Sequence, residues 1–307
     1  ELVRIEQRVM EQLRIAGSVL RRFGLDEFVL ECEARLLDRL YYRQSSKMAE
    51  CKALLTALYQ SGQETMQAKA LLCHVHILAV RNRFAEAKQL LTTAHLQENI
   101  NRFPVPIQIL YNRTLVQMGL AAFRSGMMID TYFCLHEICS SGRPKELVGQ
   151  GIPPPSTSSA STSTQHHQRV ERLRLVPHHC HVNIELVDTV FSIASVLLEL
   201  PQAAAQHAGI HTPNPRKVFQ SRHLKRILDT HERSLFNGPP ENSRETIQAA
   251  CRALIVGDWR KCQELLIDGV KVWGVGMIVD VRRVLSEKVR RAALLTMVYT
   301  MAASTTV

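Results

Sequence analysis

The segment at residues 238–266, GPPENSRETIQAACRALIVGDWRKCQELL, constrains the fold more than any other part of this chain. Its Gly-Pro-Pro start cannot continue a helix, and Asn242 or Ser243 can cap the next one. Glu245 lies in the first turn of that helix, where a carboxylate favours the positive helix end. A helix is therefore expected to begin near Arg244.

A break at Gly257 divides this segment into two helices, and the second opens on Trp259. Small residues in the first helix allow a neighbouring helix to approach closely. Because a glycine ends one helix and the apolar pattern resumes two residues later, the segment predicts a helical hairpin.

The same pattern occurs twice upstream. In AVRNRFAEAKQLL, Asn82 takes the place of Gly257 and Phe84 that of Trp259, and a weaker copy has Gly126 at the turn. This pattern is typical of stacked tetratricopeptide-like helix pairs, although an antiparallel helical bundle can produce three such imperfect copies. We predict an all-α, right-handed helical-repeat superhelix of the tetratricopeptide or HEAT type. The predicted repeat core comprises Phe84, Leu90, Met128, Leu135, Trp259, Cys262 and Leu265.

Four stretches carry a family resemblance. They are HLQENINRFPVPIQILYNRTLVQMGLAAFRSG (95–126), SSGRPKELVGQG (140–151), VPHHCHVNIELVDTVFSIASVLLELP (176–201) and the GPPENSRETIQAACRAL run. Together they resemble the family of the C-subunit of eukaryotic translation initiation factor 3, a PCI family. The resemblance extends roughly from Ala68 to the C-terminus. Residues 1–67 resemble the family only in helical character, and residues 151–168 do not resemble it.

The resemblance implies the helical-repeat part of a PCI domain in a non-catalytic, cytoplasmic scaffold subunit. Such a subunit binds the small ribosomal subunit and supports preinitiation complex assembly and mRNA recruitment. The implied partners are other subunits of the factor, especially the a-subunit, together with ribosomal proteins and rRNA. The family's winged helix and its N-terminal segment, which engages other initiation factors, are expected to lie outside this chain. A tetratricopeptide-like adaptor of another PCI assembly, of the proteasome-lid or signalosome type, is the alternative.

Breaks between apolar stretches divide the chain into four predicted segments. They are an N-terminal helical block (1–62), helical repeats (63–150), a flexible low-complexity insertion (151–168) and the repeats of the PCI region (169–307). The third segment, GIPPPSTSSASTSTQHHQ, cannot bury enough apolar surface to offset the entropy of ordering. The fourth contains a long helix predicted from apolar spacing at Ile184, Val187 and Phe191, with a break at Pro201.

The sequence carries no strong signal for catalysis, a cofactor or a metal. Its eight cysteines form no C-x-x-C pair, and we interpret them as small buried hydrophobes in a reducing compartment. His178 and His181 share a helix face, but two ligands do not make a structural zinc site. Nucleophile-elbow and phosphate-loop signatures are missing. No run of 18 apolar residues exists, so a membrane partner is not expected.

Two basic clusters contribute to the net charge of +10. Basic side chains at this density neutralise phosphates without reading sequence, which suits ribosomal RNA. A solvated helix face, or pairing with an acidic partner subunit, is the alternative for each. No aromatic platform for bases accompanies either cluster, so single-stranded base stacking is not predicted. The clusters are Arg216, Lys217, Arg222, Lys225 and Arg226, and Arg282, Arg283, Lys288, Arg290 and Arg291.

Overall fold

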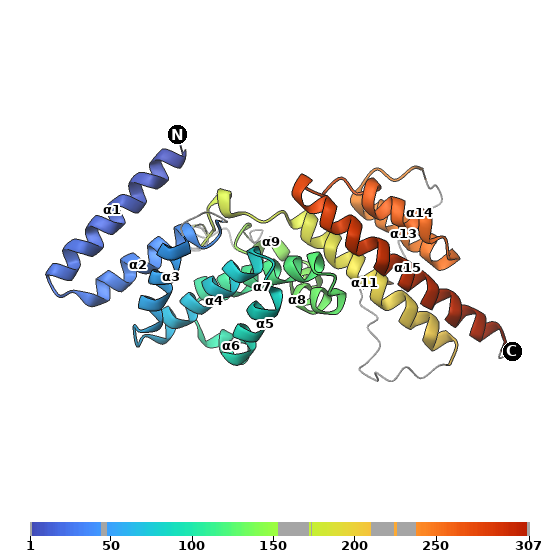
Figure 1. The fold of residues 1–307 in the computed structure, drawn as a ribbon, viewed down its shortest axis with the longest axis horizontal. Coiled ribbons are helices and arrows are strands. Elements are labelled where there is room, and N and C mark those ends of the chain that lie inside the picture. Colours follow the sequence, from blue (N-terminus) through green and yellow to red (C-terminus); the bar gives the residue numbers. More distant parts are fainter. Residues whose placement is uncertain are drawn as a thin grey trace, which may run out of the picture. The chain divides into compact units, whose positions relative to one another are not determined.

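The computed structural model describes residues 2–43, 48–152, 172, 174–209, 224–225 and 238–305. Regular structure in these residues is helical and they contain no strand, which confirms the predicted all-α class (Figure 1). The chain forms two compact units, one made of 1–121 with 145–181 and the other of 122–144 with 182–307. The superhelix and the four predicted segments stay predictions, and most of 151–168 lies outside the described residues. Among the described helices, none is both long and apolar enough to cross a bilayer.

The first unit consists of helices that pack against their neighbours in sequence, as the successive blue and cyan helices of Figure 1 show. Its core is apolar and includes Leu37, Leu58, Leu72 and Val116. The elements are α1 (Leu2–Arg22), α2 (Asp26–Leu40), α3 (Met48–Tyr59), α4 (Glu64–Val80), α5 (Phe84–Thr93), α6 (Leu96–Asn99), η1 (Ile100–Arg102), most of α7 (Val105–Arg124), α9 (Pro144–Leu147) and η2 (His178–Cys180).

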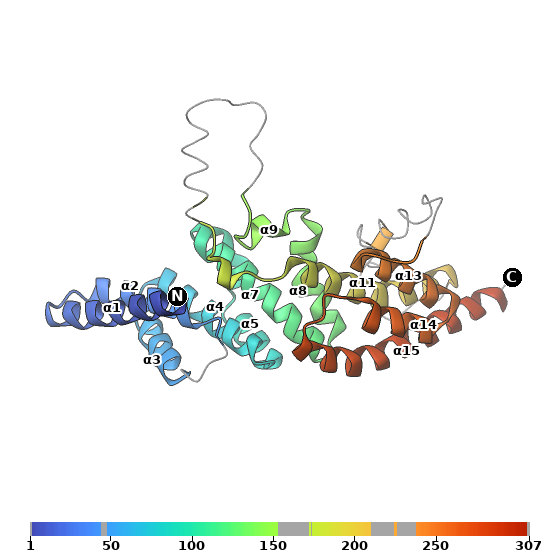
Figure 2. The same cartoon turned by 90° about the horizontal axis from the view of Figure 1, so that it is seen from above.

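In the second unit, the long helices α11 and α15 pack along each other, and α8 packs against α11 (Figures 1 and 2). The rings of Phe123 and Trp273 stack with centroids 5.9 Å apart. The Trp273 indole N–H also donates to the Leu266 carbonyl oxygen at 3.0 Å. The elements are α8 (Met128–Ser140), α11 (Ile184–His207), α13 (Ser243–Val256), α14 (Trp259–Glu264), the π-helical turn η3 (Leu265–Gly269) and α15 (Val275–Thr305).

The three aligned turns have the same backbone structure. Asn82, Gly126 and Gly257 all have positive φ, and the next helix starts two residues later in each case. Each turn is a Schellman motif, in which two N–H groups satisfy carbonyls of the last helical turn. In each turn, one of these bonds spans five residues of sequence. These bonds join Arg83 N to Leu78 O (3.0 Å), Met127 N to Ala122 O (2.9 Å) and Asp258 N to Ala253 O (2.8 Å). These bonds support the alignment of the three copies.

A fourth turn of this kind occurs at Gly24, between α1 and α2. Gly24 has a φ of +67°, and Leu25 N donates to Leu20 O at 3.2 Å. The next helix begins at Asp26, again two residues later. The sequence pattern missed this copy because its position equivalent to Phe84 is polar.

The predicted repeat core is only partly buried. Phe84, Met128, Leu135 and Cys262 are buried, whereas Leu90, Trp259 and Leu265 are half-buried. The expected burial of Trp259 is wrong, because one face of its indole carries the Arg290 guanidinium of α15. Leu266 is buried in place of Leu265, since the helix widens into a π-turn at this point and changes which side chains face the core.

Helix α11 continues through Pro201, where the sequence predicted a break. An interior proline costs about 3 kcal/mol, because one hydrogen bond is lost and the ring crowds the preceding turn. Beyond the proline, Ala204 and Ala205 are buried, and α11 packs along α15. This packing offsets the cost of the proline. The predicted break is therefore wrong.

The chain segments on either side of residues 153–171 are joined at their base. The Asn112 side chain on α7 donates to the Leu147 carbonyl oxygen at 2.9 Å. Val176 N donates to the Gly149 carbonyl oxygen, also at 2.9 Å. Gly149 has a φ of +69° and lies against Ile109 and Val176. The base of this connection is therefore fixed by the first unit itself.

A polar group is buried in the first unit. Arg113 of α7 is 2% exposed and donates to the Cys180 carbonyl oxygen at 2.6 Å, which holds η2 against α7. His76 of α4 is also buried, and its ring meets Tyr41 edge-on with centroids 4.9 Å apart. Burial, followed by the nearby Arg113 charge, lowers the pKa of His76 to about 3. His76 therefore stays neutral at physiological pH.

We expect His76 to make the first unit sensitive to mild acid. Its folded pKa lies below the unfolded value, so below pH 6.5 the unfolded chain binds a proton that the folded chain does not. The free energy of unfolding should therefore decrease as the pH is lowered below about 6.5, by up to about 1.4 kcal/mol per pH unit. His76→Phe keeps a ring against Tyr41 and should reduce this slope in urea unfolding between pH 7 and 5. His74, whose pKa is also lowered by partial burial, leaves a residual slope. An unchanged slope in His76→Phe would contradict the assignment.

Candidate binding surface

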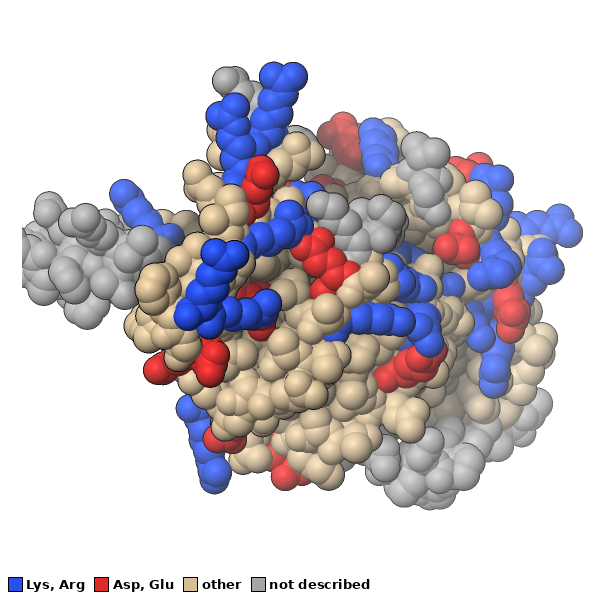
Figure 3. Space-filling view, turned by 60° about the vertical axis from the view of Figure 1, so that its left-hand side comes forward, with Lys and Arg blue, Asp and Glu red and all other residues tan. Residues whose placement is uncertain are grey.

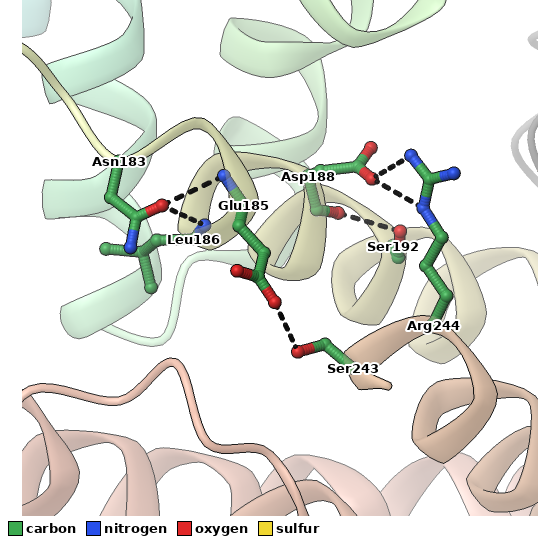
Figure 4. Close-up of polar contacts among 7 residues, drawn as sticks. All are labelled: Asn183, Glu185, Leu186, Asp188, Ser192, Ser243 and Arg244. Carbon is green, nitrogen blue, oxygen red and sulfur yellow. Dashed lines mark hydrogen bonds and ion pairs between the residues drawn. The ribbon is translucent and has the colours of Figure 1, made fainter. Parts of the chain in front are cut away.

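The start of α11 is fixed by its own cap. Asn183 accepts hydrogen bonds from the backbone N–H groups of Glu185 (3.0 Å) and Leu186 (3.3 Å) through its side-chain oxygen (Figure 4). This is the normal role of asparagine at a helix N-terminus. The cap sets where α11 begins and therefore which of its carboxylates can reach α13.

Two side chains of α13 meet those carboxylates. Ser243 donates to Glu185 at 2.9 Å, and Arg244 donates to one carboxylate oxygen of Asp188 through Nε (3.2 Å) and a terminal nitrogen (2.8 Å) (Figure 4). At the start of α13, Glu245 accepts the Glu241 N–H at 2.9 Å in place of a cap by Asn242 or Ser243. The polar residues of the GPPENSRE run therefore join α13 to α11, and their role here is structural.

The second basic cluster lies on α15 and is divided among several partners. Arg282 pairs with Asp268 at 3.2 Å. Arg283 lies 3.6 Å from Asp280, and Lys288 lies 3.6 Å from Glu287. These pairs are largely solvent-exposed and hold their cations weakly. The cluster is therefore a set of cations that are weakly paired with nearby acidic residues.

An aromatic side chain accompanies this cluster. The Arg290 guanidinium lies 4.7 Å from the centre of the Trp259 ring, and that of Arg260 lies 5.4 Å from it. An aromatic residue that the sequence did not associate with this cluster therefore lies beside it. The sequence pattern assigned Trp259 to the core, so the contact between α14 and α15 was missed. A guanidinium over an indole ring keeps N–H groups that can bind a ligand.

The first basic cluster falls almost entirely outside the described residues. Arg216, Lys217, Arg222 and Arg226 are not described, and Lys225 is exposed beside buried Leu224. The assignment of this cluster to RNA or subunit contact stays a prediction. On the face shown in Figure 3, basic side chains are spread widely, with acidic ones among them.

A half-open cavity of about 480 Å³ lies in the second unit. Its walls are the turn before α8 and the start of that helix, the C-terminal half of α11, and the middle of α15. Leu197, Leu198, Pro201, Ala292 and Leu295 provide an apolar lining. The size suits a few apolar side chains of a ligand or partner.

The described part of the chain offers little support for a metal site or a cysteine nucleophile. His178 and His181 lie at a single 3-10 turn with ring centroids 4.8 Å apart. In the residues described, no three His, Cys, Asp or Glu side chains are grouped for a metal. All eight cysteines are free, and burial raises the pKa of Cys139, Cys251 and Cys262 to about 12. These three thiols stay protonated and unreactive at neutral pH.

A family model and individual relatives of this chain all point to the same protein family. Residues 34–210 match the family model described as the N-terminus of eukaryotic translation initiation factor 3 subunit 8. The chain is 40% identical over 245 residues to the C-subunit of eukaryotic translation initiation factor 3 of Schizosaccharomyces pombe, an alignment covering 80% of this chain and 26% of the relative. The C-subunit of Neurospora crassa is 37% identical over 246 residues, covering 80% and 27%. That of Phaeosphaeria nodorum is 37% identical over 254 residues, covering 82% and 29%.

The chain thus spans about a quarter of the length of these relatives. Their names describe subunits of an initiation factor and not enzymes. The family model covers more than half of the chain, from within α2 to shortly after the end of α11. The chain therefore belongs to the family of the C-subunit of eukaryotic translation initiation factor 3.

Proposed function

We propose that this chain is part of a non-catalytic scaffold subunit of translation initiation factor 3 that helps to bind the small ribosomal subunit. In this role it supports assembly of the preinitiation complex and mRNA recruitment. The family match is the observation that carries the proposal. Other subunits of the factor, especially the a-subunit, are the proposed protein partners, and the proposed location is the cytoplasm.

The α-helical architecture supports a scaffold role. Helix pairs that repeat the same turn present extended surfaces, because each pair contacts mainly its neighbours. Within the second unit, α15 carries Arg283 and Arg290 at exposed positions, with Trp259 of α14 beside the latter. Cations on such a surface can contact phosphates, and the planar guanidinium can make two hydrogen bonds to one phosphate.

Charge reversal on α15 tests the RNA part of the proposal. The double variant Arg283→Glu and Arg290→Glu should weaken binding to purified small ribosomal subunits while the protein stays folded. Each phosphate contact that is lost should reduce the slope of log affinity against log salt by about 0.9 for a duplex-like site. Sedimentation at several salt concentrations measures both quantities.

Arg8→Glu provides a control. Arg8 is exposed on α1 of the other unit, and its substitution changes the net charge by the same amount per residue. It should leave the affinity nearly unchanged. If the α15 variant instead fails to assemble with partner subunits in RNA-free conditions, the surface pairs with an acidic subunit. Unchanged ribosome binding and unchanged assembly would contradict a binding role for Arg283 and Arg290.

A further inference from the structure

We propose that the cavity between α8, α11 and α15 docks an amphipathic helix of a partner protein, with apolar side chains inserted and acidic side chains on its flanks. The proposal goes beyond membership of the initiation factor, because it assigns a second, protein-binding surface to the unit. It rests on the shape and lining of the cavity, on the exposed residues along its edge, and on the sign of the charge beside it.

The floor of the cavity is apolar and well supported. Leu197 and Ala292 are buried, and Leu198 and Leu295 are half-buried and face the cavity from α11 and α15. Pro201 also lines the cavity, at a point where the α11 backbone lacks one N–H donor. Burial of a partner's apolar side chain here would gain about 25 cal/mol for each Å² removed from water.

Apolar surface reaches the opening of the cavity, where Ile129 is 60% exposed. Leu294 and Val298 on α15 are also exposed, at 65% and 52%, but lie outside the lining. The stretch of α15 that borders the cavity runs from Lys288 to Tyr299, about 16 Å at 1.5 Å per residue. This length corresponds to about three helical turns of a partner. An extended apolar strip of this kind favours a helix over a compact small molecule.

Charge at the rim indicates an acidic partner. Arg291 and Lys288 line the cavity, with Lys288 3.6 Å from Glu287 outside the lining, and the only anionic side chain in the lining is Asp130 in the first turn of α8. Asp130 has interactions within the protein, and its carboxylate lies at the N-terminal, positive end of the α8 dipole, which partly offsets its charge. Arg291 is exposed, so its guanidinium can turn toward a carboxylate. A nucleic acid would match the cations but would leave the apolar floor uncovered.

Site-specific photo-cross-linking identifies the occupant. A benzophenone amino acid replaces Ile129 in the full chain, expressed in the cells from which it comes, and the cross-linked segment is sequenced by mass spectrometry. We expect one adduct, to a protein segment with apolar residues at helical spacing and flanking Asp or Glu. A synthetic peptide of that segment should bind the unmodified protein, and Ile129→Asp and Arg291→Glu should each weaken it about tenfold, or 1.4 kcal/mol.

Val279→Asp is the matched control, because Val279 is 72% exposed on α15 and lies outside the cavity lining. It should change the affinity less than twofold. Circular dichroism melts check that all three variants stay folded. The proposal is overturned by the absence of an adduct, by an adduct to RNA or to a segment without carboxylates, or by binding that Ile129→Asp leaves unchanged. Small-subunit sedimentation is measured in parallel, so that failure of this surface is distinguished from failure of ribosome binding.

Discussion

Phe84→Ala is expected to lower the free energy of unfolding of the first unit by about 3 to 5 kcal/mol. Phe84 begins α5, is only 3% exposed and packs where α4 and α5 meet. Truncation would leave a cavity that fixed neighbours cannot fill. Trp259→Ala, at the aligned position of the second unit, should cost only about 1 to 2 kcal/mol, because the indole is half-buried and its main partner is a surface arginine.

Hydrogen exchange measures the two effects separately, which is needed because a chain with two units does not unfold in a single two-state step. Amides of α4 and α5 should exchange more than about 100-fold faster in Phe84→Ala, and those of α13 and α14 only about 5- to 30-fold faster in Trp259→Ala, because 1.4 kcal/mol corresponds to about tenfold. Equal effects of the two substitutions would show that the indole contributes to the core as much as the phenylalanine does.

Gly149→Ala is expected to destabilise the first unit by about 2 to 5 kcal/mol. Two costs combine, since a side chain at φ +69° is strained and the added Cβ would lie 2.9 Å from Ile109 Cγ2 and 3.1 Å from Val176 Cγ2. Both neighbours are β-branched and cannot rotate away freely. Hydrogen exchange of the α4 and α7 amides measures this loss separately from the second unit.

Gly62→Ala, also in the first unit, separates the two costs. Gly62 has a similar φ of +67°, but a Cβ there would meet no atom within 4 Å. Its substitution should cost only the backbone strain, about 1 to 2 kcal/mol. If both variants lose the same amount of stability, crowding against Ile109 and Val176 contributes nothing.

The turns were the most predictable part of the fold. A residue that tolerates positive φ, followed two positions later by a large apolar residue, identified the turns at Asn82, Gly126 and Gly257, because the Schellman motif depends on local sequence. The turn at Gly24 has the same backbone but lacks the apolar marker, so the pattern did not identify it. Local rules thus located the turns independently of tertiary contacts.

The errors concern features that tertiary packing decides. Pro201 was expected to end α11, but the local cost of proline is smaller than the gain from packing the whole helix on α15. Trp259 was assigned to the core by analogy with Phe84, and only the placement of Arg290 on a different helix shows otherwise. For the same reason, the cavity between α8, α11 and α15 could not be predicted, since its walls come from three helices distant in sequence.

The hydrogen bond between Val176 and Gly149 makes the chain tolerant of foreign sequence at one position. Since the entropy of closing a loop grows with the logarithm of its length, doubling the number of residues between them costs only about 0.6 kcal/mol. The ends stay anchored by the first unit whatever sequence joins them. An affinity tag or a fluorescent protein inserted between Pro154 and Thr164 is therefore expected to leave the helix pairs of the first unit unaltered.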